Sequence, residues 1–188
     1  MKKCDVLIAG VGGQGILLCS NILGTACIIE GMPVKGAEVH GMAQRGGSVE
    51  AHVRIGCFYG PMIPRGSADM LIAAEPLEGA RFSGWLKKGG IAVVNTAQIP
   101  PVGQTYKTED MAEIIKESAG NIITRDFTEE AIKLGSIQTL NVLMLGAALK
   151  FLPLKKESIA AAIGKTVKKD FIELNAAALN RGISITLQ

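Results

Sequence analysis

Cys4-Asp5-Val6-Leu7-Ile8-Ala9, followed by Gly10-Val11-Gly12-Gly13-Gln14-Gly15, is the stretch of sequence that decides the fold. Residues 4–9 are almost entirely apolar, which predicts a short buried strand. The glycines then allow a tight turn, and the mostly apolar residues 16–30 predict a helix that Gly31 and Pro33 end. A strand, a glycine turn and a helix in this order are typical of an α/β layered domain.

The turn has the spacing Gly10-x-Gly12-x-x-Gly15, which also occurs in dinucleotide-binding proteins. Glycines there let a phosphate approach the backbone, and the helix N-terminus attracts the anion. Those proteins also place an Asp or Glu for the ribose at the end of a second strand, roughly 20 residues further on. Glu30 lies about that far away but at the end of the predicted helix, which argues against NAD or FAD. The turn either holds another phosphate or carrier group, or only permits close packing.

The remaining chain alternates predicted strands and helices. Residues 34–47 are glycine-rich and predicted to be irregular, and 56–66 to form a loop. Apolar and polar residues alternate from Ser48 to Ile55, which predicts a strand with one side that faces solvent or a partner. Further strands are expected at 68–74, 91–95 and 122–124, and helices at 77–88, 108–118, 128–134, 137–151, 158–163 and 167–180, the last closed by Gly182. Without linkers or repeats, residues 1–188 are expected to form a single domain.

A second glycine-rich segment reads His40-Gly41-Met42-Ala43-Gln44-Arg45-Gly46-Gly47-Ser48. Loops that combine polar donors with glycines often carry function. Arg45 can form paired hydrogen bonds with a carboxylate or phosphate, but a turn with a solvated charge explains the segment equally well. No Cys or Ser stands beside His40 as a nucleophile, so we assign no catalytic residue to this chain. His52, on the polar side of its strand, is expected at an interface or on the surface.

Asn141 is a polar residue within the apolar run Leu140-Asn141-Val142-Leu143-Met144. A buried Asn needs hydrogen-bond partners, so it bonds either the glycine-rich loops of its own chain, which we favour, or a ligand. The carboxylates are scattered or lie in the first turns of predicted helices, where they suit capping better than acid–base catalysis. They include Glu75, Glu78, Glu109, Asp110, Glu129 and Glu130.

Composition excludes several classes of protein. The net charge is only +3 over 188 residues and aromatic residues make up 4%, so a nucleic-acid-binding role is not expected. No apolar run reaches the roughly 20 residues that span a bilayer, and no signal peptide is recognised, which predicts a cytoplasmic protein. Cys4, Cys19, Cys27 and Cys57 lack the spacing of a zinc or iron–sulfur site, so we expect no metal and mostly buried free thiols. The apolar share of 48% fits a buried parallel sheet, a surface covered by partner chains, or both.

The two glycine-rich motifs in this order resemble the gamma-type domain of 2-oxoacid:ferredoxin oxidoreductases. The segment His40 to Gly47 is most similar to that of the small beta subunit of the indolepyruvate enzymes. Two later blocks extend the resemblance over essentially the whole chain: Asn141-Val142-Leu143-Met144-Leu145-Gly146 and Phe171-Ile172-Glu173-Leu174-Asn175. Either glycine motif alone is a weak signal, whereas the ordered set is fairly specific.

The resemblance implies a three-layer α/β/α sandwich with a mixed, partly Rossmann-like sheet. It also implies an accessory subunit of a complex that converts a 2-oxoacid, first of all indolepyruvate or another aryl pyruvate, to acyl-CoA and passes electrons to ferredoxin. A larger catalytic partner would carry thiamine diphosphate and iron–sulfur clusters, and this chain would bind no cofactor alone but help to form the active-site and coenzyme A region. The cofactor-facing turn would be Gly10, Gly12, Gly13, Gln14 and Gly15. The substrate or interface residues would be His40, Gln44, Arg45, Gly46, Gly47, Ser48 and Asn141.

Two alternatives belong to other classes. An independent NAD- or FAD-dependent oxidoreductase would need a ribose-binding residue that the sequence does not offer. A binding module for an anionic small molecule at the glycine turn would bind coenzyme A or a nucleotide without a partner. The identity of the 2-oxoacid and the stoichiometry of the complex are not encoded in recognisable motifs, and a homodimer of the isolated chain stays open.

Overall fold

The computed structural model describes residues 3–41, 46–56 and 60–187, which fold around one six-stranded sheet. Strands β1, β4, β5 and β6 run parallel, and β3 runs antiparallel to both of its neighbours, β1 and β2. The sheet is therefore mixed, as the resemblance implied. In spatial order the strands are β2 (Val34–His40), β3 (Ser48–Ile55), β1 (Cys4–Val11), β4 (Ala68–Ala73), β5 (Leu86–Asn95) and β6 (Ala119–Arg125).

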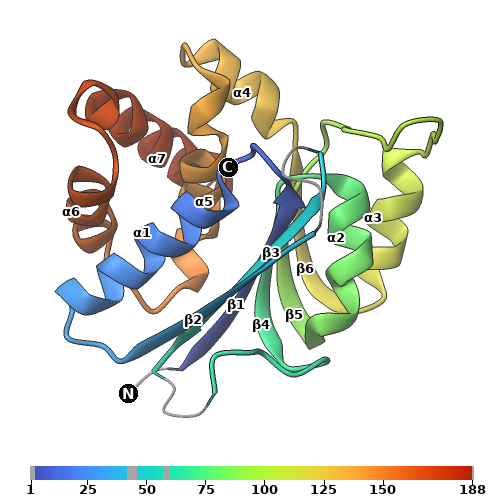
Figure 1. Cartoon of the computed structure of the whole chain (residues 1–188), viewed down its shortest axis with the longest axis horizontal. Helices are drawn as coiled ribbons and strands as arrows, with labels where there is room; N and C mark the ends of the chain where they lie inside the picture. The colour runs from blue at the N-terminus through green and yellow to red at the C-terminus, as the bar shows by residue number, and fades with distance from the viewer. Residues whose placement is uncertain (1–2, 42–45, 57–59, 188) are drawn as a thin grey trace.

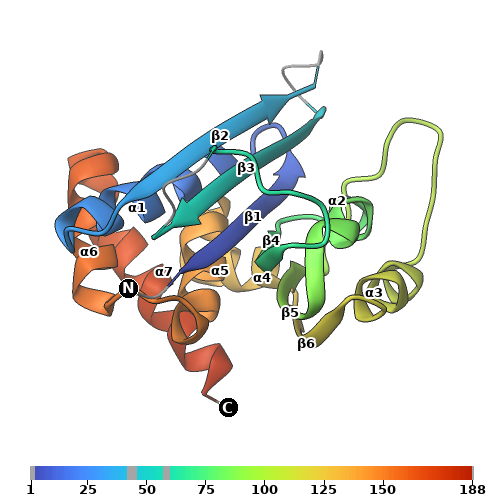
Figure 2. The same ribbon diagram turned by 90° about the horizontal axis from the view of Figure 1, so that it is seen from below.

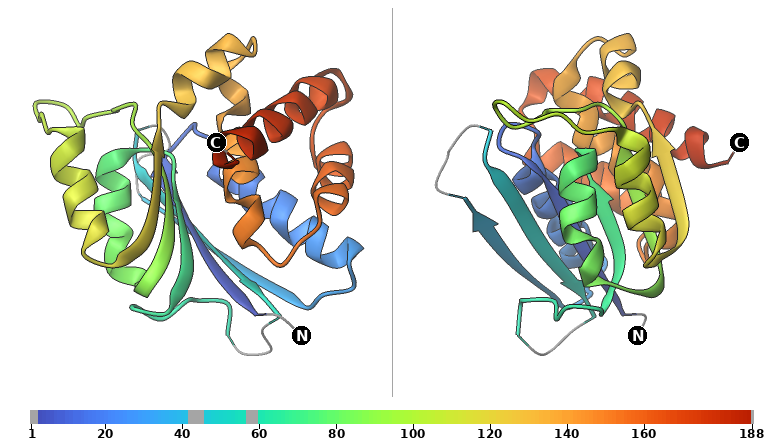
Figure 3. Two further views of the ribbon diagram at one scale, coloured as in Figure 1. Left: turned by 180° about the vertical axis from the view of Figure 1, so that it is seen from behind. Right: turned by 90° about the vertical axis from the view of Figure 1, so that its right-hand side faces the viewer.

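Helices cover both faces of the sheet, which confirms the three-layer α/β/α sandwich (Figure 1). One face carries α1 (Ile16–Ile29), α5 (Leu140–Ala148), α6 (Lys156–Thr166) and α7 (Ile172–Thr186), with α4 (Phe127–Lys133) above them. The other face carries α2 (Pro76–Phe82) and α3 (Thr108–Lys116), as the view from behind in Figure 3 shows. Short 3₁₀ turns complete the chain at Ser83–Trp85, Ile137–Thr139, Leu149–Phe151 and Lys169–Phe171.

The apolar run of β1 is explained by burial on both faces of the sheet. Val6 and Ile8 pack into the core beneath α1 and α5, whereas Leu7 and Ala9 pack into a second core beneath α2. Alternate side chains of a strand point to opposite faces, so a strand covered twice has no polar side. The predicted buried strand and the helix that follows it are both confirmed.

Three sequence predictions of secondary structure were wrong. Residues 34–40, predicted to be irregular, form β2, because pairing with β3 outweighs the poor strand propensity of Gly36 and Glu38. The helix predicted over 77–88 ends at Phe82, and Leu86 already begins β5 beside Ala68 of β4. Gly89 and Gly90, expected as a helix stop, lie inside β5. Similarly, Gly182 does not close the last helix, which continues to Thr186.

His52 was also predicted wrongly, because its side chain is fully buried. The backbone N–H of Ile63 donates to His52 Nδ1 over 3.2 Å, and Nε2 lies 3.5 Å from Glu50 Oε1. The segment that follows β3 therefore covers the polar side of that strand. Alternation along a strand identifies its two sides, but it does not say whether a loop folds back over one of them.

Three of the four cysteines fall within the described residues, and they are buried and free as predicted. Burial raises the pKa of the Cys19 thiol to about 12, which leaves it without thiolate at neutral pH. Cys57 lies outside the described residues. Within the described part of the chain, no helix is long and apolar enough to cross a membrane, and no three His, Cys, Asp or Glu side chains cluster as metal ligands would.

Candidate functional site at the glycine turn

The glycine turn is shaped by backbone geometry that requires glycine. Gly15 caps the N-terminus of α1 with a positive φ of 75°, and Gly13 has a φ of 107°. A Cβ atom on Gly10 would lie 2.7 Å from Gln14 Oε1 and 2.8 Å from Ile16 Cδ1. The chain can therefore leave β1 and enter α1 through only four residues, 12–15, because these glycine positions lack side chains.

Gln14 fills the crevice between the carboxyl ends of β1 and β4. Its Oε1 accepts a hydrogen bond from the Val11 N–H over 2.8 Å, and its Nε2 donates to the carbonyl oxygen of Ala74 over 2.8 Å. Open α/β sheets bind nucleotides at such a point, where the helices after neighbouring strands leave to opposite faces. Here α1 and α2 leave to opposite faces of the sheet (Figure 1). The side chain of Gln14, however, occupies the crevice through its two hydrogen bonds.

The described parts of the two glycine-rich motifs lie side by side in the structure, although different roles were predicted for them. The pairing of β1 with β3 sets Gly10 opposite Val49 and Val11 opposite Ser48. The Gly12 N–H then donates to the Gly47 carbonyl oxygen over 2.9 Å. Gly46, Gly47 and Ser48 thus border the turn, and β2 places the half-exposed His40 at the same edge of the sheet. Gln44 and Arg45 lie outside the described residues.

Asn141 ties the turn to α5. Its Nδ2 donates to the Gly15 carbonyl oxygen over 2.9 Å, and only 3% of the residue is exposed. Its Oδ1 accepts from the Val142 N–H over 2.8 Å. The bond from Asn141 to a glycine-rich loop, favoured from the sequence, is confirmed. The same amide also reaches the wall of a pocket beside the turn.

Two pockets flank the glycine turn. The larger, of about 620 Å³, is lined by Gly12, Gly13, Gln14, Gly15, Leu18, Ala97, Gln98, Ile99, Thr128, Ile137, Gln138, Leu140 and Asn141. Its wall combines apolar side chains with neutral amides and a hydroxyl, and no charged side chain of the described residues lines it. The smaller, of about 330 Å³, lies on the other side of Gly12 and Gly13, where His40 and Leu17 line it.

Buried polar groups behind the turn hold the neighbouring loops in place. Glu75 caps α2 by accepting the Glu78 N–H over 2.9 Å, and it also accepts the Ile99 N–H over 3.3 Å. Burial raises the pKa of Glu75 although these hydrogen bonds oppose the shift. The capping role expected for Glu75 is confirmed.

Asn95 is a structural residue that the sequence reasoning missed. It ends β5 and donates to the Ala74 carbonyl oxygen over 3.0 Å and to Thr128 Oγ1 over 2.9 Å. Its Oδ1 accepts the Phe127 N–H over 2.9 Å. The available signal was a single polar residue at the carboxyl end of an apolar strand, which is where such sheets place functional and connecting groups.

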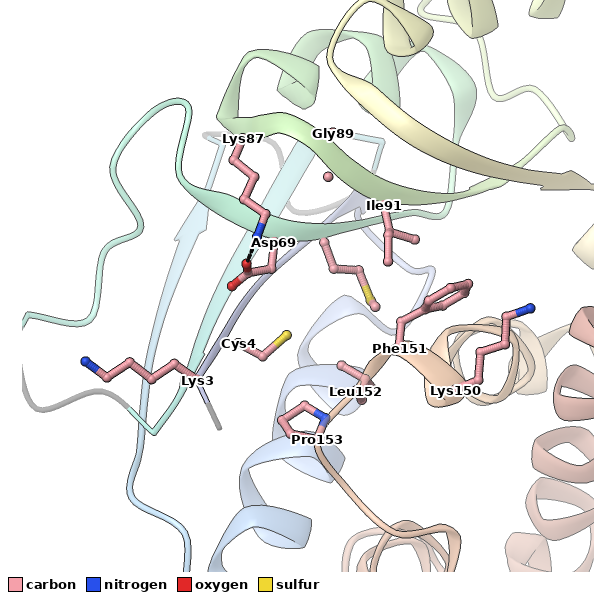
Figure 4. A pocket seen from close by; sticks show the side chains of 12 residues that line it. Lys3, Cys4, Asp69, Lys87, Gly89, Ile91, Lys150, Phe151, Leu152 and Pro153 are labelled. Carbon is pink, nitrogen blue, oxygen red and sulfur yellow. Dashed lines mark hydrogen bonds and ion pairs between the residues drawn. The ribbon is translucent and has the colours of Figure 1, made fainter. Parts of the chain in front are cut away.

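A further pocket, of about 470 Å³, lies at the opposite edge of the sheet (Figure 4). Its charged rim is largely engaged, since Lys87 pairs with Asp69 and Lys150 donates to the Thr186 carbonyl oxygen. No residue of the glycine turn or of the described part of 40–48 lines it. The carboxyl edge of the sheet is therefore the better candidate for the functional site.

Glu130 fixes α4, which carries Thr128 of the pocket wall. Arg125 donates to Glu130 Oε1 over 2.9 Å and Arg181 donates to Oε2 over 2.8 Å, while the carboxylate is only 7% exposed. The hydrogen bond from Arg125, and then that from Arg181, hold the pKa of Glu130 below its ordinary value of 4.5. A carboxylate with a lowered pKa in the folded state stabilises the fold above that ordinary value.

Replacing Glu130 with Gln should therefore lower the free energy of unfolding by about 2 kcal/mol at neutral pH, because two arginines lose a buried anion. The difference from the wild type should disappear as the pH falls below 4.5 and through the lower pKa of the folded state. Urea unfolding from about pH 7 to about pH 3 measures it. Glu129→Gln, which removes an exposed pair with Lys133, is the matched control and should change little. A Glu130→Gln deficit that is constant with pH would contradict the assignment.

The comparisons with known proteins agree with this architecture. The family model for pyruvate ferredoxin/flavodoxin oxidoreductases matches residues 5–185. The indolepyruvate oxidoreductase subunit IorB of Thermococcus kodakarensis is 40% identical over 193 residues, covering 97% of this chain and 96% of that protein. The pyruvate/ketoisovalerate oxidoreductases common subunit gamma of the same organism is 29% identical and covers 97% of each chain.

Solved structures define the class to which the fold belongs. The gamma subunit of a keto/oxoacid ferredoxin oxidoreductase from Geobacter sulfurreducens superposes with a TM-score of 0.75 at 24% identity, over 98% of both chains. A 2-oxoglutarate:ferredoxin oxidoreductase from Magnetococcus marinus superposes with a TM-score of 0.75 at 16% identity, over 100% of this chain but 31% of that longer one. The fold is thus that of the gamma subunits of 2-oxoacid:ferredoxin oxidoreductases. By sequence, the chain belongs to the pyruvate ferredoxin/flavodoxin oxidoreductase family, and its relatives are subunits of such enzymes.

Proposed function

We propose that residues 1–188 form one gamma-type domain that acts as the accessory subunit of an indolepyruvate:ferredoxin oxidoreductase. The observation that carries this proposal is the 40% identity to an indolepyruvate oxidoreductase subunit over 97% of the chain, against 29% to a pyruvate/ketoisovalerate subunit over the same share. The pocket at the glycine turn adds support, because its wall offers neutral hydrogen-bonding groups and apolar surface but no nucleophile paired with a base.

In this proposal a larger partner subunit, in the cytoplasm, carries thiamine diphosphate and the iron–sulfur clusters. The complex cleaves the bond between the carboxylate and carbonyl carbons of the 2-oxoacid and releases carbon dioxide. The acyl group is joined to the sulfur of coenzyme A, and the electron pair passes to ferredoxin. Thiamine diphosphate, bound in the partner, would supply the electron sink for the decarboxylation. The residues of this chain bind and orient, and none of them carries out a bond-breaking step.

The larger pocket at the glycine turn is the part of this chain that we assign to coenzyme A. Its neutral lining suits the uncharged, amide-bearing arm of that molecule better than the phosphates at the other end. Gln98 and Gln138 can exchange hydrogen bonds with amides, and Leu18 and Ile137 can contact the methylene groups. His40, Gly46, Gly47 and Ser48 would face the partner subunit at the same edge of the sheet, and we propose the same role for Gln44 and Arg45.

The function is tested by producing this chain with and without its large partner subunit and assaying both preparations without oxygen. We expect coenzyme A-dependent formation of acyl-CoA and reduction of ferredoxin only by the complex, with kcat/KM highest for indolepyruvate among indolepyruvate, 2-ketoisovalerate and pyruvate. Turnover by the chain alone would contradict the accessory role. A preference of the complex for 2-ketoisovalerate or pyruvate would contradict indolepyruvate as the substrate, but it would still support a 2-oxoacid:ferredoxin oxidoreductase.

Gln138→Glu tests the pocket in the same complex. A carboxylate in the wall would lose water without gaining a charged partner when the uncharged arm of coenzyme A covers it, so we expect KM for coenzyme A to rise about fivefold with kcat unchanged. Gln104→Glu makes the same change of charge in an exposed loop outside the pocket and should leave KM unchanged. Equal KM values for the two variants would contradict the assignment of coenzyme A to this pocket.

A further inference from the structure

Ser48, at the start of β3, attaches the second glycine-rich segment to helix α2. Its Oγ donates a hydrogen bond to Glu78 Oε2. The other carboxylate oxygen of Glu78 lies 3.2 Å from Arg81 Nε, and only 5% of Glu78 is exposed. Hydrogen bonds to a charged carboxylate are stronger than those between neutral groups. The edge of the sheet that carries Gly46 and Gly47 is therefore held to α2, which Figure 2 shows between the strands β1 and β3 and the long loop before α3.

Glu78 occupies the position at which a glutamate ordinarily caps its own helix. Glu75 is the N-cap of α2, and Glu78 is the third residue after it. A glutamate at this position commonly accepts the N–H of the N-cap residue. Here its two oxygens contact Ser48 and Arg81 instead, while its backbone N–H donates to Glu75 Oε2 over 2.9 Å. The Glu78 side chain thus joins two distant segments rather than closing the end of the helix.

Glu75 extends this connection to the larger pocket at the glycine turn. Its Oε1 accepts the Ile99 N–H over 3.3 Å. Ile99 lines that pocket next to Gln98. Pro100 and Pro101 follow and have no N–H to donate. The Glu75 carboxylate is therefore the last partner that a backbone N–H finds along this wall of the pocket.

Glu75 is an unusual N-cap, and its length gives it a second contact. Short polar side chains such as Ser, Asn and Asp are preferred at this position. A glutamate reaches further, so its two oxygens can cap α2 and also accept the Ile99 N–H. Glu75 is only 1% exposed, and among the described residues no cation forms an ion pair with it. Burying a charge in this way is unfavourable, so a shorter and neutral cap would serve stability equally well.

We propose that Glu78 and Glu75 are positioning residues that couple the placement of Ser48 to that of the pocket wall at Ile99. When Ser48 releases Glu78, the carboxylate can turn back toward the start of α2. Its negative charge then repels that of Glu75 and weakens the longer of the two hydrogen bonds of Glu75, which is the one to Ile99. A partner subunit that contacts Gly46 to Ser48 therefore also adjusts the pocket. The effect on coenzyme A rests on the proposed function, whereas the coupling itself does not.

Hydrogen exchange of single backbone amides in the full chain, measured by NMR, tests the coupling. In Ser48→Ala the Ile99 N–H should exchange about fivefold faster. The Thr96 N–H, which donates to the Arg125 carbonyl oxygen over 2.9 Å in the same loop, should keep its wild-type rate. Ser48→Thr retains the hydroxyl and should restore the Ile99 rate, and Ser67→Ala, which removes a hydroxyl that bonds elsewhere, should not change it. No change at Ile99 in Ser48→Ala, or equal acceleration of Thr96 and Ile99, would overturn the proposal.

Glu75→Gln tests the step next to the pocket. Gln keeps one acceptor oxygen and replaces the other with an NH₂ group, which cannot accept an N–H. The shorter bond caps α2, so the loss should fall on the Ile99 N–H, which should exchange about tenfold faster. In the complex, KM for coenzyme A should rise about threefold with kcat unchanged. Glu109→Gln, at an exposed carboxylate in the first turn of α3, should change neither quantity.

The two readouts of Glu75→Gln separate the coupling from the proposed function. An Ile99 exchange rate equal to that of the wild type would overturn the coupling, whatever the complex does. A faster rate with an unchanged KM would support the coupling and contradict the assignment of coenzyme A to the pocket.

Discussion

Gly15→Ala should destabilise the chain by about 3 kcal/mol and remove most of the activity of the complex. The new Cβ would lie 2.5 Å from Asn141 Nδ2 and would force that amide away from the Gly15 carbonyl oxygen. Alanine also adopts the positive φ of 75° at a cost of about 1–2 kcal/mol. The lost hydrogen bond adds roughly another 1 kcal/mol. Urea unfolding of the isolated chain and acyl-CoA formation by the complex measure the two effects.

Gly13→Ala separates strain in the backbone from the contact with Asn141. Gly13 also has a positive φ, of 107°, but no atom lies within 4 Å of a Cβ placed there. Its variant should therefore lose stability through the backbone alone and retain the position of Asn141. The double variant Gly15→Ala with Asn141→Ala should recover part of the stability lost in Gly15→Ala, since the overlap is gone. Equal losses for Gly13→Ala and Gly15→Ala would contradict the role given to Asn141.

The sequence predicted the part of the site that is built from local chemistry. An apolar strand, a glycine turn and an apolar helix follow one another so directly that β1 and α1 could be placed to within one or two residues. Asn141 could be linked to the glycine turn because an amide within an apolar helix must find a partner. Neither inference required knowledge of which strands pair.

The parts that were missed depend on contacts between distant segments. Strand β2 exists because β3 offers a pairing edge, and β5 begins at Leu86 because β4 lies beside it. His52 is buried by a segment that follows its strand, and Gln14 fills a crevice whose other wall is Ala74. Local propensity is weak against such pairing and burial, so no reading of neighbours along the chain could recover them.

The role of Gly182 also depends on a contact between distant segments, and its substitution is expected to cause the largest loss of stability. A glycine late in an amphipathic stretch reads as a helix stop, but here it lies in the middle of the contact between α7 and α5. A Cβ at Gly182 would overlap the Leu143 carbonyl oxygen and approach Gly146 Cα to 2.9 Å. The facing Gly146 is equally crowded by the backbone of α7. The two glycines let the helices approach backbone to backbone.

Gly182→Ala should therefore lower the free energy of unfolding by about 4 kcal/mol, because rigid backbone rather than a flexible side chain must move. Gly164→Ala, in α6, is the control, since no atom lies within 4 Å of a Cβ there. That variant should gain about 0.5–1 kcal/mol, the ordinary advantage of Ala over Gly within a helix. Thermal and urea unfolding of both variants distinguish the two environments. If both variants were neutral or stabilised, the close crossing of α5 and α7 would be refuted, because only separated helices leave room for the added methyl group.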